Sequence, residues 1–281
     1  MWKISIITVC YNAEQVIKQT ISSVLEQSYH NFEYVVIDGK STDDTMTIVS
    51  ELQPKFINAG ISMTVVSEKD SGIYNAMNKG IAKSRGEWLL FLNAGDYLCD
   101  SNVLKRIAPV LNKSEYDVVY GDTILKSNCM YKYDKSKPLT DIKNGMSFCH
   151  QSVFISRIVM SSFLYDERYN ICADHNFFVR LYVEGFRFHS VDFPISVFLL
   201  GGVSTNLSSY QKRDLERIEI YYSNGLIDET EREKRIKLVK KESFKRGIKN
   251  KVKALIPSKI ISYRMDRYYE KDGWSENFPI Y

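Results

Sequence analysis

The chain contains 281 residues, of which 44% are hydrophobic and 26% charged, with a formal net charge of +4, as is typical of one large globular domain with or without an extension. Because no stretch approaches the roughly 18 apolar residues of a membrane-spanning helix, we expect no transmembrane segment. The five cysteines are scattered and odd in number, which argues against a zinc site and a disulfide framework and favours the reducing cytosol.

The first half of the chain alternates short apolar runs with amphipathic segments. The apolar runs predict buried strands at residues 4–9, 34–37, 63–66 and 88–92. The segments between them predict helices. Four strands that alternate with helices are typical of a parallel sheet with short crossover connections. We therefore expect an α/β fold, and we interpret the apolar N-terminus as its first strand rather than as a signal peptide.

Asp38, Asp70 and Asp96 each follow a predicted strand. Because open α/β sheets bind ligands outside the carboxyl ends of their strands, we expect these acids to gather at a binding edge. Asp96 could there hold a hard divalent cation that also carries phosphate oxygens. Each acid could instead only cap the helix that follows it. Dinucleotide binding is not expected, since no G-x-G-x-x-G motif follows the first strand.

The second half of the chain does not continue the regular alternation of apolar runs and amphipathic segments. Residues 103–111 predict a helix and residues 117–121 a strand. The polar stretch 122–147 predicts mobile loops and short antiparallel strands, which are suited to acceptor recognition. Two further strands are predicted at residues 188–191 and 195–199.

Three places in this half could carry function. His150 and Gln151 are polar groups in an apolar frame, where a lone histidine could equally be a satisfied core residue. Asp174 opens a predicted helix, either as its N-cap or as an acid of the first turn, and this position suits both a capping acid and a general base. Gly202 and Ser204 belong to a flexible G-G-V-S-T turn, which could contact an anion or a sugar or simply end a strand.

Charge is distributed unevenly along the chain. Residues 232–267 contain 14 Lys and Arg against 3 Asp and Glu, whereas the rest contains 24 against 31. Apolar residues within 248–256 recur at helical spacing among the basic ones, which predicts an amphipathic basic helix. We expect residues 208–281 to form a helical extension, whose aromatic residues Tyr268, Tyr269, Trp274 and Phe278 could dock on the body or lie at a lipid interface. An anionic membrane surface is the expected partner, in preference to nucleic acid.

Seven stretches of the chain, in order, resemble motifs of bacterial family 2 glycosyltransferases of the GT-A fold, in the branch that builds colanic acid, O-antigen and capsular polysaccharides. They are SIITVCYN (5–12), VVIDGKSTDDT (35–45), SEKDSGIYNAMNKG (67–80), GEWLLFLNAGD (86–96), HQSVF (150–154), AD (173–174) and GGVST (201–205). The resemblance implies a GT-A, Rossmann-like fold with a mostly parallel central sheet flanked by helices. It also implies a glycosyltransferase domain over 1–207, with a nucleotide-sugar half to about residue 121 and an acceptor half over 122–207.

The same resemblance implies roles for individual residues. Asp174 matches the catalytic base, and Asp96 matches the last acid of the D-x-D-like motif that holds Mn²⁺ or Mg²⁺. The donor-binding set is Thr8, Tyr11, Asn12, Asp38, Asp70, Asn78, Asn93 and Ala94. The set assigned to the acceptor or the diphosphate is His150, Gln151, Gly202 and Ser204.

The chain departs from the family pattern at Asn93, where many members carry the first aspartate of the metal motif, and at Lys40, Asp44 and Asn75. Fewer charged ligands predict a metal site that depends more on diphosphate oxygens and water. The departures also leave open a non-catalytic protein that binds glycans or nucleotides. Slow hydrolysis of a sugar nucleotide discriminates, because a pure binder shows none.

The resemblance implies inverting transfer of a sugar, most readily from a UDP-sugar, to a saccharide acceptor. The expected acceptor is linked to polyprenyl diphosphate, in O-antigen, capsule or exopolysaccharide biosynthesis. Asp174 would take the proton of the acceptor hydroxyl, while a cation on Asp96 stabilises the departing nucleoside diphosphate. We expect a cytoplasmic enzyme that is peripheral at the inner face of the cytoplasmic membrane.

Overall fold

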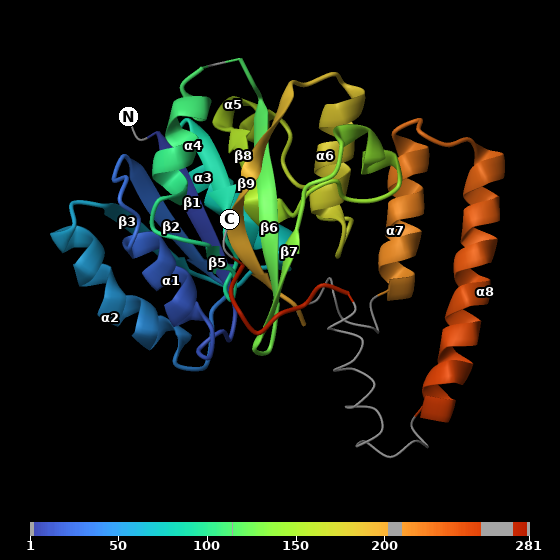
Figure 1. The fold of residues 1–281 in the computed structure, drawn as a ribbon, viewed down its shortest axis with the longest axis horizontal. Coiled ribbons are helices and arrows are strands. Elements are labelled where there is room, and N and C mark those ends of the chain that lie inside the picture. The colour runs from blue at the N-terminus through green and yellow to red at the C-terminus, as the bar shows by residue number, and fades with distance from the viewer. Residues whose placement is uncertain (1–2, 114, 202–209, 254–271, 280–281) are drawn as a thin grey trace.

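The structure, a computed structural model, describes residues 3–113, 115–201, 210–253 and 272–279, with side chains of the third range up to residue 243. Its strands, shown in Figure 1, are β1 (Ile4–Cys10), β2 (Phe32–Asp38), β3 (Ser62–Ser67), β4 (Trp88–Phe91), β5 (Tyr97–Leu98), β6 (Val118–Ser127), β7 (Met130–Asp134), β8 (Val153–Ser156) and β9 (Phe188–Leu199). Its α-helices are α1 (Ile17–Leu25), α2 (Thr45–Asn58), α3 (Ile73–Lys83), α4 (Val103–Leu111), α5 (Arg157–Ser162), α6 (Ala173–Val183), α7 (Tyr210–Ser223) and α8 (Glu229–Lys253). Short 3₁₀ turns occur at Leu139–Lys143 and His150–Ser152.

The strands of the described residues form one sheet in the order β3-β2-β1-β4-β8-β6-β9-β5, and β7 pairs with β6. The first four strands of this order are parallel, as the alternation of strands and helices predicts. The sheet then becomes mixed, because β8 runs antiparallel to both β4 and β6. The α/β class is therefore confirmed, and the parallel part coincides with the first half of the chain.

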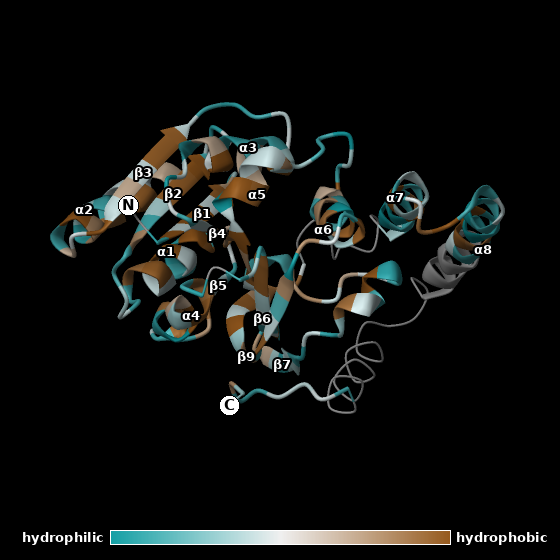
Figure 2. Cartoon of the chain, turned by 90° about the horizontal axis from the view of Figure 1, so that it is seen from above, coloured by the Kyte–Doolittle hydropathy of each residue, from teal (hydrophilic) through white to brown (hydrophobic). Residues whose placement is uncertain are grey.

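Helices cover both faces of the sheet. Helices α1, α2 and α4 pack on one face, while α3, α5 and α6 pack on the other, as Figures 1 and 2 show together. The inner parallel strands are buried on both faces, since every residue of β1, β2 and β4 is buried, whereas the edge strand β3 is partly exposed. Burial on both faces explains why these strands read as continuous apolar runs in the sequence.

The structure confirms one prediction for the second half and corrects another. The short antiparallel strands expected within residues 122–147 are present, because β6 continues to Ser127 and forms a hairpin with β7. Buried Asp122 accepts hydrogen bonds from the hydroxyl of Tyr133 (2.5 Å) and from the backbone N–H (2.8 Å) and hydroxyl (2.9 Å) of Ser136, which orders this polar stretch. The two strands predicted at 188–191 and 195–199 are one strand, since a register shift in the β6–β9 pairing accommodates Pro194.

The C-terminal part contacts the body at two places. Ile220 and Tyr221 of α7 belong to the same hydrophobic core as α6. At the hairpin, Ser275 pairs with Tyr131 as an isolated bridge, and the ring of Phe278 packs edge-on against Tyr131. Of the two alternatives for Phe278, docking on the body is the one observed, while Tyr268 and Tyr269 lie outside the described residues. The domain boundary at residue 207 stays a prediction, although α7 shares its core with the body.

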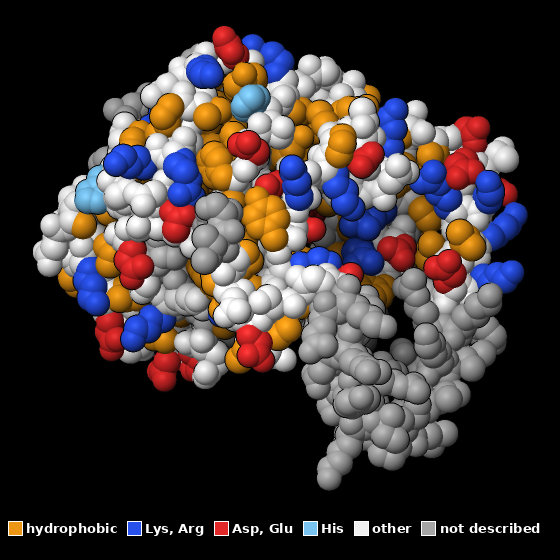
Figure 3. Space-filling model, viewed as in Figure 1, with side chains coloured by type: hydrophobic (Ala, Val, Ile, Leu, Met, Phe, Trp, Pro, Cys, Tyr) orange, Lys and Arg blue, Asp and Glu red, His pale blue; other side chains and the backbone are white. Residues whose placement is uncertain are grey.

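The basic extension is only partly described. Helix α8 packs along α7, where Arg232 pairs with Glu219 at 2.8 Å. Lys and Arg side chains gather over the region of α6 and α7 on the face shown in Figure 3. The side chains that carry the predicted amphipathic pattern, residues 248–256, lie outside the described residues. In the described part of the chain, no helix combines the length and apolarity needed to span a membrane.

Candidate active site

A cleft of about 760 Å³ opens at the carboxyl ends of β1 and β4. Its walls come from the turn after β1, the turn after β4, the first turns of α3 and the stretch from residue 170 to α6. The end of β9 closes the remaining side. This is the edge where an open α/β sheet binds ligands.

Most residues that the sequence analysis assigned to the site line this one cleft. They are Tyr11, Asn12, Asp70, Asn93, Ala94, Asp96, His150, Gln151 and Asp174. Gly202 and Ser204 lie outside the described residues. The structure therefore brings together acids that are 78 positions apart in the sequence, at residues 96 and 174.

Thr8 and Asp38 do not line the cleft. The hydroxyl of Thr8 donates to the carbonyl oxygen of Leu92 at 2.7 Å and accepts from Tyr34 at 2.8 Å, both in the core. Asp38 is fully buried and accepts hydrogen bonds from the hydroxyls of Ser41 (2.5 Å) and Ser67 (2.6 Å). Both side chains are buried and hydrogen-bonded inside the protein. The expectation that all three acids face the ligand space is therefore wrong for Asp38.

Asn78 also points away from the cleft. Its amide nitrogen donates to Glu167 Oε1 at 3.0 Å and to the carbonyl oxygen of Tyr165 at 3.0 Å. Asn75 donates to the same Glu167 carboxylate at 3.1 and 3.2 Å. An aspartate at position 75, as the family pattern has it, would place a second carboxylate against Glu167. The departure at Asn75 therefore has a local cause in the packing of α3 on the loop before α6.

Asp96 and Asn93 form the turn after β4. Asp96 is 4% exposed, and its Oδ1 accepts the backbone N–H of Leu199 at 2.9 Å. Burial raises the pKa of Asp96 to about 8, because the charged form loses its hydration. The side-chain oxygen of Asn93 is buried without a hydrogen-bond partner. The turn thus places a carboxyl group and a buried, unsatisfied amide oxygen in the wall of the cleft.

These two groups fit a hard divalent cation in part. Mg²⁺ and Mn²⁺ prefer oxygen ligands. The buried amide oxygen of Asn93 has no hydrogen-bond partner, and a cation could satisfy it. Among the described residues, no group of three or more His, Cys, Asp and Glu side chains could enclose a metal ion. A cation held by Asn93 and Asp96 would therefore take its other ligands from phosphate oxygens and water.

Asp174 lies in the first turn of α6, while Cys172 is the N-cap residue, so the first-turn interpretation is confirmed and the N-cap one is not. Oδ1 of Asp174 accepts the backbone N–H of His175 at 2.8 Å and lies 2.9 Å from the hydroxyl oxygen of Tyr74. No described residue hydrogen-bonds Oδ2. A carboxylate that lines a cleft and has one oxygen fixed by hydrogen bonds is suited to act as a general base.

His150 is both a core residue and a cleft residue. It is 5% exposed, and its Nε2 lies 2.7 Å from the hydroxyl oxygen of Tyr165. Burial lowers the pKa of His150, and the charge of Asp174 offsets part of that effect. The imidazole is therefore neutral near pH 7, so it offers the cleft a hydrogen-bonding group rather than a charge.

Two contacts that shape the site have no signal in the sequence. Tyr74 of α3 touches Asp174 of α6, and Leu199 of β9 supplies the backbone N–H that holds Asp96. In each of these contacts the two residues are about 100 positions apart in the chain. No local spacing could reveal them, because only the packing of α3 and β9 against the site creates these contacts.

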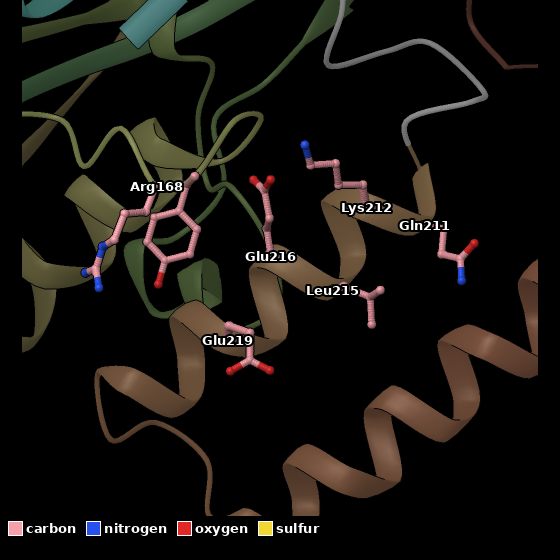
Figure 4. Close-up of a pocket in the computed structure, with 7 residues that line it drawn as sticks. Arg168, Gln211, Lys212, Leu215, Glu216 and Glu219 are labelled. Atoms are coloured by element: carbon pink, nitrogen blue, oxygen red, sulfur yellow. The ribbon is translucent and has the colours of Figure 1, made fainter. Parts of the chain in front are cut away.

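A second, more open cavity of about 460 Å³ lies between α7 and the loop before α6. Arg168 and Tyr169 come from the loop, and Lys212, Glu216 and Glu219 come from α7. Figure 4 shows these charged side chains of α7 beside the loop that carries Arg168. The next residues of that loop, Asn170 and Ile171, line the main cleft, so the loop separates the two cavities.

Comparison with known protein families gives a match over most of this region. The family model described as Glycosyl transferase family 2 matches residues 5–178. A PGL/p-HBAD biosynthesis glycosyltransferase of Mycobacterium tuberculosis is 33% identical over 180 residues, which cover 63% of this chain and 69% of the relative. An uncharacterized glycosyltransferase of Haemophilus influenzae is 34% identical over 104 residues, covering 37% of this chain and 40% of the relative.

Solved structures share the architecture at low sequence identity. S. aureus TarS residues 1–349 in complex with UDP-GlcNAc superposes with a TM-score of 0.63 at 19% identity, covering 83% of this chain and 70% of that one. The mannosyltransferase PcManGT from Pyrobaculum calidifontis, in complex with GDP-Man and Mn²⁺, gives 0.63 at 16% identity, covering 81% and 65%. These likenesses concern the fold, and they confirm a GT-A architecture for this chain.

Proposed function

Since the chain belongs to glycosyl transferase family 2, we propose that it is an inverting, metal-dependent enzyme that moves a sugar from a UDP-sugar to a hydroxyl group of a saccharide acceptor. One observation carries the proposal. Asp96, beside the orphaned amide oxygen of Asn93, lines the same cleft as Asp174, whose Oδ1 is held by the backbone N–H of His175. A site for the leaving diphosphate and a base for the incoming alcohol therefore face one space.

Asp174 performs the proton transfer in this proposal. As the acceptor oxygen attacks the anomeric carbon, Oδ2 of Asp174 takes its proton, so the nucleophile gains negative character only as the new bond forms. The new carbon–oxygen bond forms on the face opposite the departing nucleoside diphosphate, which leaves with the electron pair of the broken bond. The configuration at the anomeric carbon inverts, and no covalent enzyme intermediate is needed.

Asn93 and Asp96 hold the diphosphate side of the cleft. A divalent cation bound there would neutralise the charge that grows on the leaving group. The complex of the distant mannosyltransferase with GDP-Man and Mn²⁺ supports this assignment by analogy of fold. Because an amide replaces one carboxylate, the protein contributes one negative charge fewer, and we expect the bound diphosphate to complete the site.

The acceptor in this proposal is a saccharide on polyprenyl diphosphate, used for O-antigen, capsule or exopolysaccharide synthesis. The support is the basic composition of residues 232–267, with 14 Lys and Arg against 3 Asp and Glu. Such a segment is attracted to the anionic cytoplasmic leaflet, where a lipid-linked acceptor would be presented. The enzyme would then act from the cytoplasm as a peripheral protein.

Two measurements in sequence test the proposed function. A panel of UDP- and GDP-sugars with Mn²⁺ is first screened for a rise in melting temperature, and the best donor is then offered synthetic polyprenyl-diphosphate saccharides. The proposal predicts UDP release and a product whose anomeric configuration, read by NMR, is opposite to that of the donor. A product with retained configuration would contradict inversion, and binding without any UDP release would favour the non-catalytic alternative.

A further inference from the structure

The stretch just before α6 is held by a side chain from α7. Glu216 accepts the backbone N–H groups of Asn170 (3.1 Å, Oε1), Ile171 (3.0 Å, Oε2) and Cys172 (2.9 Å, Oε2). Cys172 is the N-cap residue of α6, which receives no side-chain cap from its own helix. A carboxylate from a different helix thus satisfies N–H groups at this helix start and also faces the positive end of the helix dipole.

The held stretch is connected directly to Asp174. The carbonyl oxygen of Ile171 lies 2.7 Å from the hydroxyl oxygen of Tyr74, and that same hydroxyl lies 2.9 Å from Asp174 Oδ1. Asn170 and Ile171 also form part of the cleft wall. Movement of residues 170–172 would therefore displace the cleft wall, the start of α6 and the partner of Asp174 together.

Helix α7 is itself fixed firmly enough to act as the support. Ile220 is fully buried and Tyr221 is 4% exposed, and the Tyr221 hydroxyl lies 3.0 Å from Nε2 of His175 on α6. Glu216 is one turn earlier on the same helix. Its carboxylate is therefore presented by a packed helix and not by a loose chain end.

We propose that Glu216 is a positioning residue for Asp174. By clamping residues 170–172, it fixes the start of α6 and the Tyr74–Asp174 contact in the geometry that the reaction needs. The inference rests on the proposed function, because it takes Asp174 as the base. It adds a determinant outside the range matched by the family model, which ends at residue 178.

Glu216→Gln is the direct test, and Glu219→Gln is its matched control. Glutamine has the size of glutamate, yet it presents an NH₂ group to backbone N–H donors and so cannot accept all three bonds. Glu219 lies on the same helix and lines the same second cavity, but it pairs with Arg232 of α8. Both variants remove one negative charge from α7, but only Glu216→Gln loses the contact to residues 170–172, whereas Glu219→Gln loses the ion pair with Arg232.

Hydrogen exchange provides a readout that does not depend on catalysis. Glu216→Gln should speed exchange of the amides of residues 170–172 by about 10- to 100-fold, as expected for losing hydrogen bonds to a charged acceptor. Glu219→Gln and Asp174→Asn should leave exchange at those amides unchanged. Unchanged exchange in Glu216→Gln would overturn the clamp, and a loss of protection throughout the chain would make Glu216 a general stability residue instead.

Turnover provides the second readout, with UDP release measured from the sugar nucleotide that the wild-type protein hydrolyses fastest. Glu216→Gln should lower kcat about tenfold or more, since small displacements of a catalytic group are costly, while the Kd for UDP with Mn²⁺ stays within twofold. Wild-type kcat in Glu216→Gln, alongside an inactive Asp174→Asn, would overturn this inference alone. A wild-type kcat in Asp174→Asn would contradict the assignment of Asp174 as the base. It would then also contradict the role of Glu216 in positioning that base.

Discussion

The hydroxyl of Tyr74 lies 2.9 Å from Oδ1 of Asp174, although the two residues are 100 positions apart. Tyr74 projects from α3, on the donor side of the sheet, and Asp174 projects from the first turn of α6. Burial, followed by the charge of Asp174, raises the pKa of Tyr74 well above its usual value, so the hydroxyl stays protonated. The contact therefore fixes one carboxylate oxygen, and in the proposed mechanism the other takes the proton of the acceptor.

Tyr74→Phe removes this contact with little change in shape. We expect kcat for UDP release to fall by about tenfold, the usual scale for a hydrogen bond to a charged group, while UDP affinity stays unchanged. Tyr133→Phe is the matched control, because its hydroxyl bonds Asp122 away from the cleft. Equal kcat in Tyr74→Phe and wild type would show that the contact does not orient Asp174.

Asp96→Asn tests the metal site. The substitution keeps the size of the side chain and an oxygen that can accept the Leu199 N–H, so the fold should be retained. Calorimetry should show that Mn²⁺ strengthens UDP binding to the wild-type protein and has little effect on the variant. The reciprocal change, Asn93→Asp, adds a carboxylate and should strengthen Mn²⁺-dependent binding. Metal-independent UDP binding in all three proteins would refute a cation on this turn.

His175 makes the α6–α7 contact sensitive to acid. Burial, with a smaller effect of Arg217, lowers its pKa from 6.5 to about 3. As pH falls from about 6.5 towards 3, the unfolded chain binds a proton that the folded chain excludes, so stability present at neutral pH is lost. His175→Gln removes this proton uptake, and we expect its melting temperature to decline less between pH 7 and pH 4.

The control for this measurement is His30→Gln, because His30 is exposed and should leave the pH dependence as in the wild type. Parallel melting curves for His175→Gln and wild type across the same range would show that acid acts elsewhere.

The basic extension predicts membrane binding that depends on charge. Because α7 shares its core with the body, the informative truncation ends at residue 228 and keeps α7 while removing α8 and all that follows. The full chain should sediment with anionic liposomes and be released by salt, whereas the truncated chain should stay in solution. Neutral phosphatidylcholine vesicles serve as the control. Equal sedimentation of both chains would show that residues 229–281 do not provide the attraction.

The sequence predicts the parallel half of the fold well. Burial on both faces makes β1, β2 and β4 continuous apolar runs, and turn residues mark their ends. The helix bounds of α4 follow the predicted range 103–111. Short antiparallel strands are expected after residue 121, but the bounds of the β6–β7 hairpin are not, since the buried carboxylate of Asp122 orders part of this polar stretch.

The candidate site is predictable at residues that follow strand ends, and not at residues that reach it across the fold. Asp70 and Asp96 line the cleft, as the strand pattern predicts. Asp38 also lies at the end of a strand, but its carboxylate accepts hydrogen bonds from the hydroxyls of Ser41 and Ser67. Strand position indicates which edge a side chain occupies, whereas its hydrogen-bond partners decide whether it faces ligand. Glu216, which holds the residues just before α6, belongs to α7. The local sequence pattern does not predict that α7 packs against this part of the fold.

The central claim is that Asp174 activates the acceptor in the cleft where Asp96 supports the leaving group. Asp174→Asn, assayed for sugar transfer and for UDP–Mn²⁺ binding in the same preparation, tests it most directly. The account predicts that turnover falls by about 10²- to 10⁴-fold, the usual contribution of a positioned base, while the Kd for UDP stays within twofold. Turnover close to that of the wild-type protein, with UDP still bound normally, would contradict it.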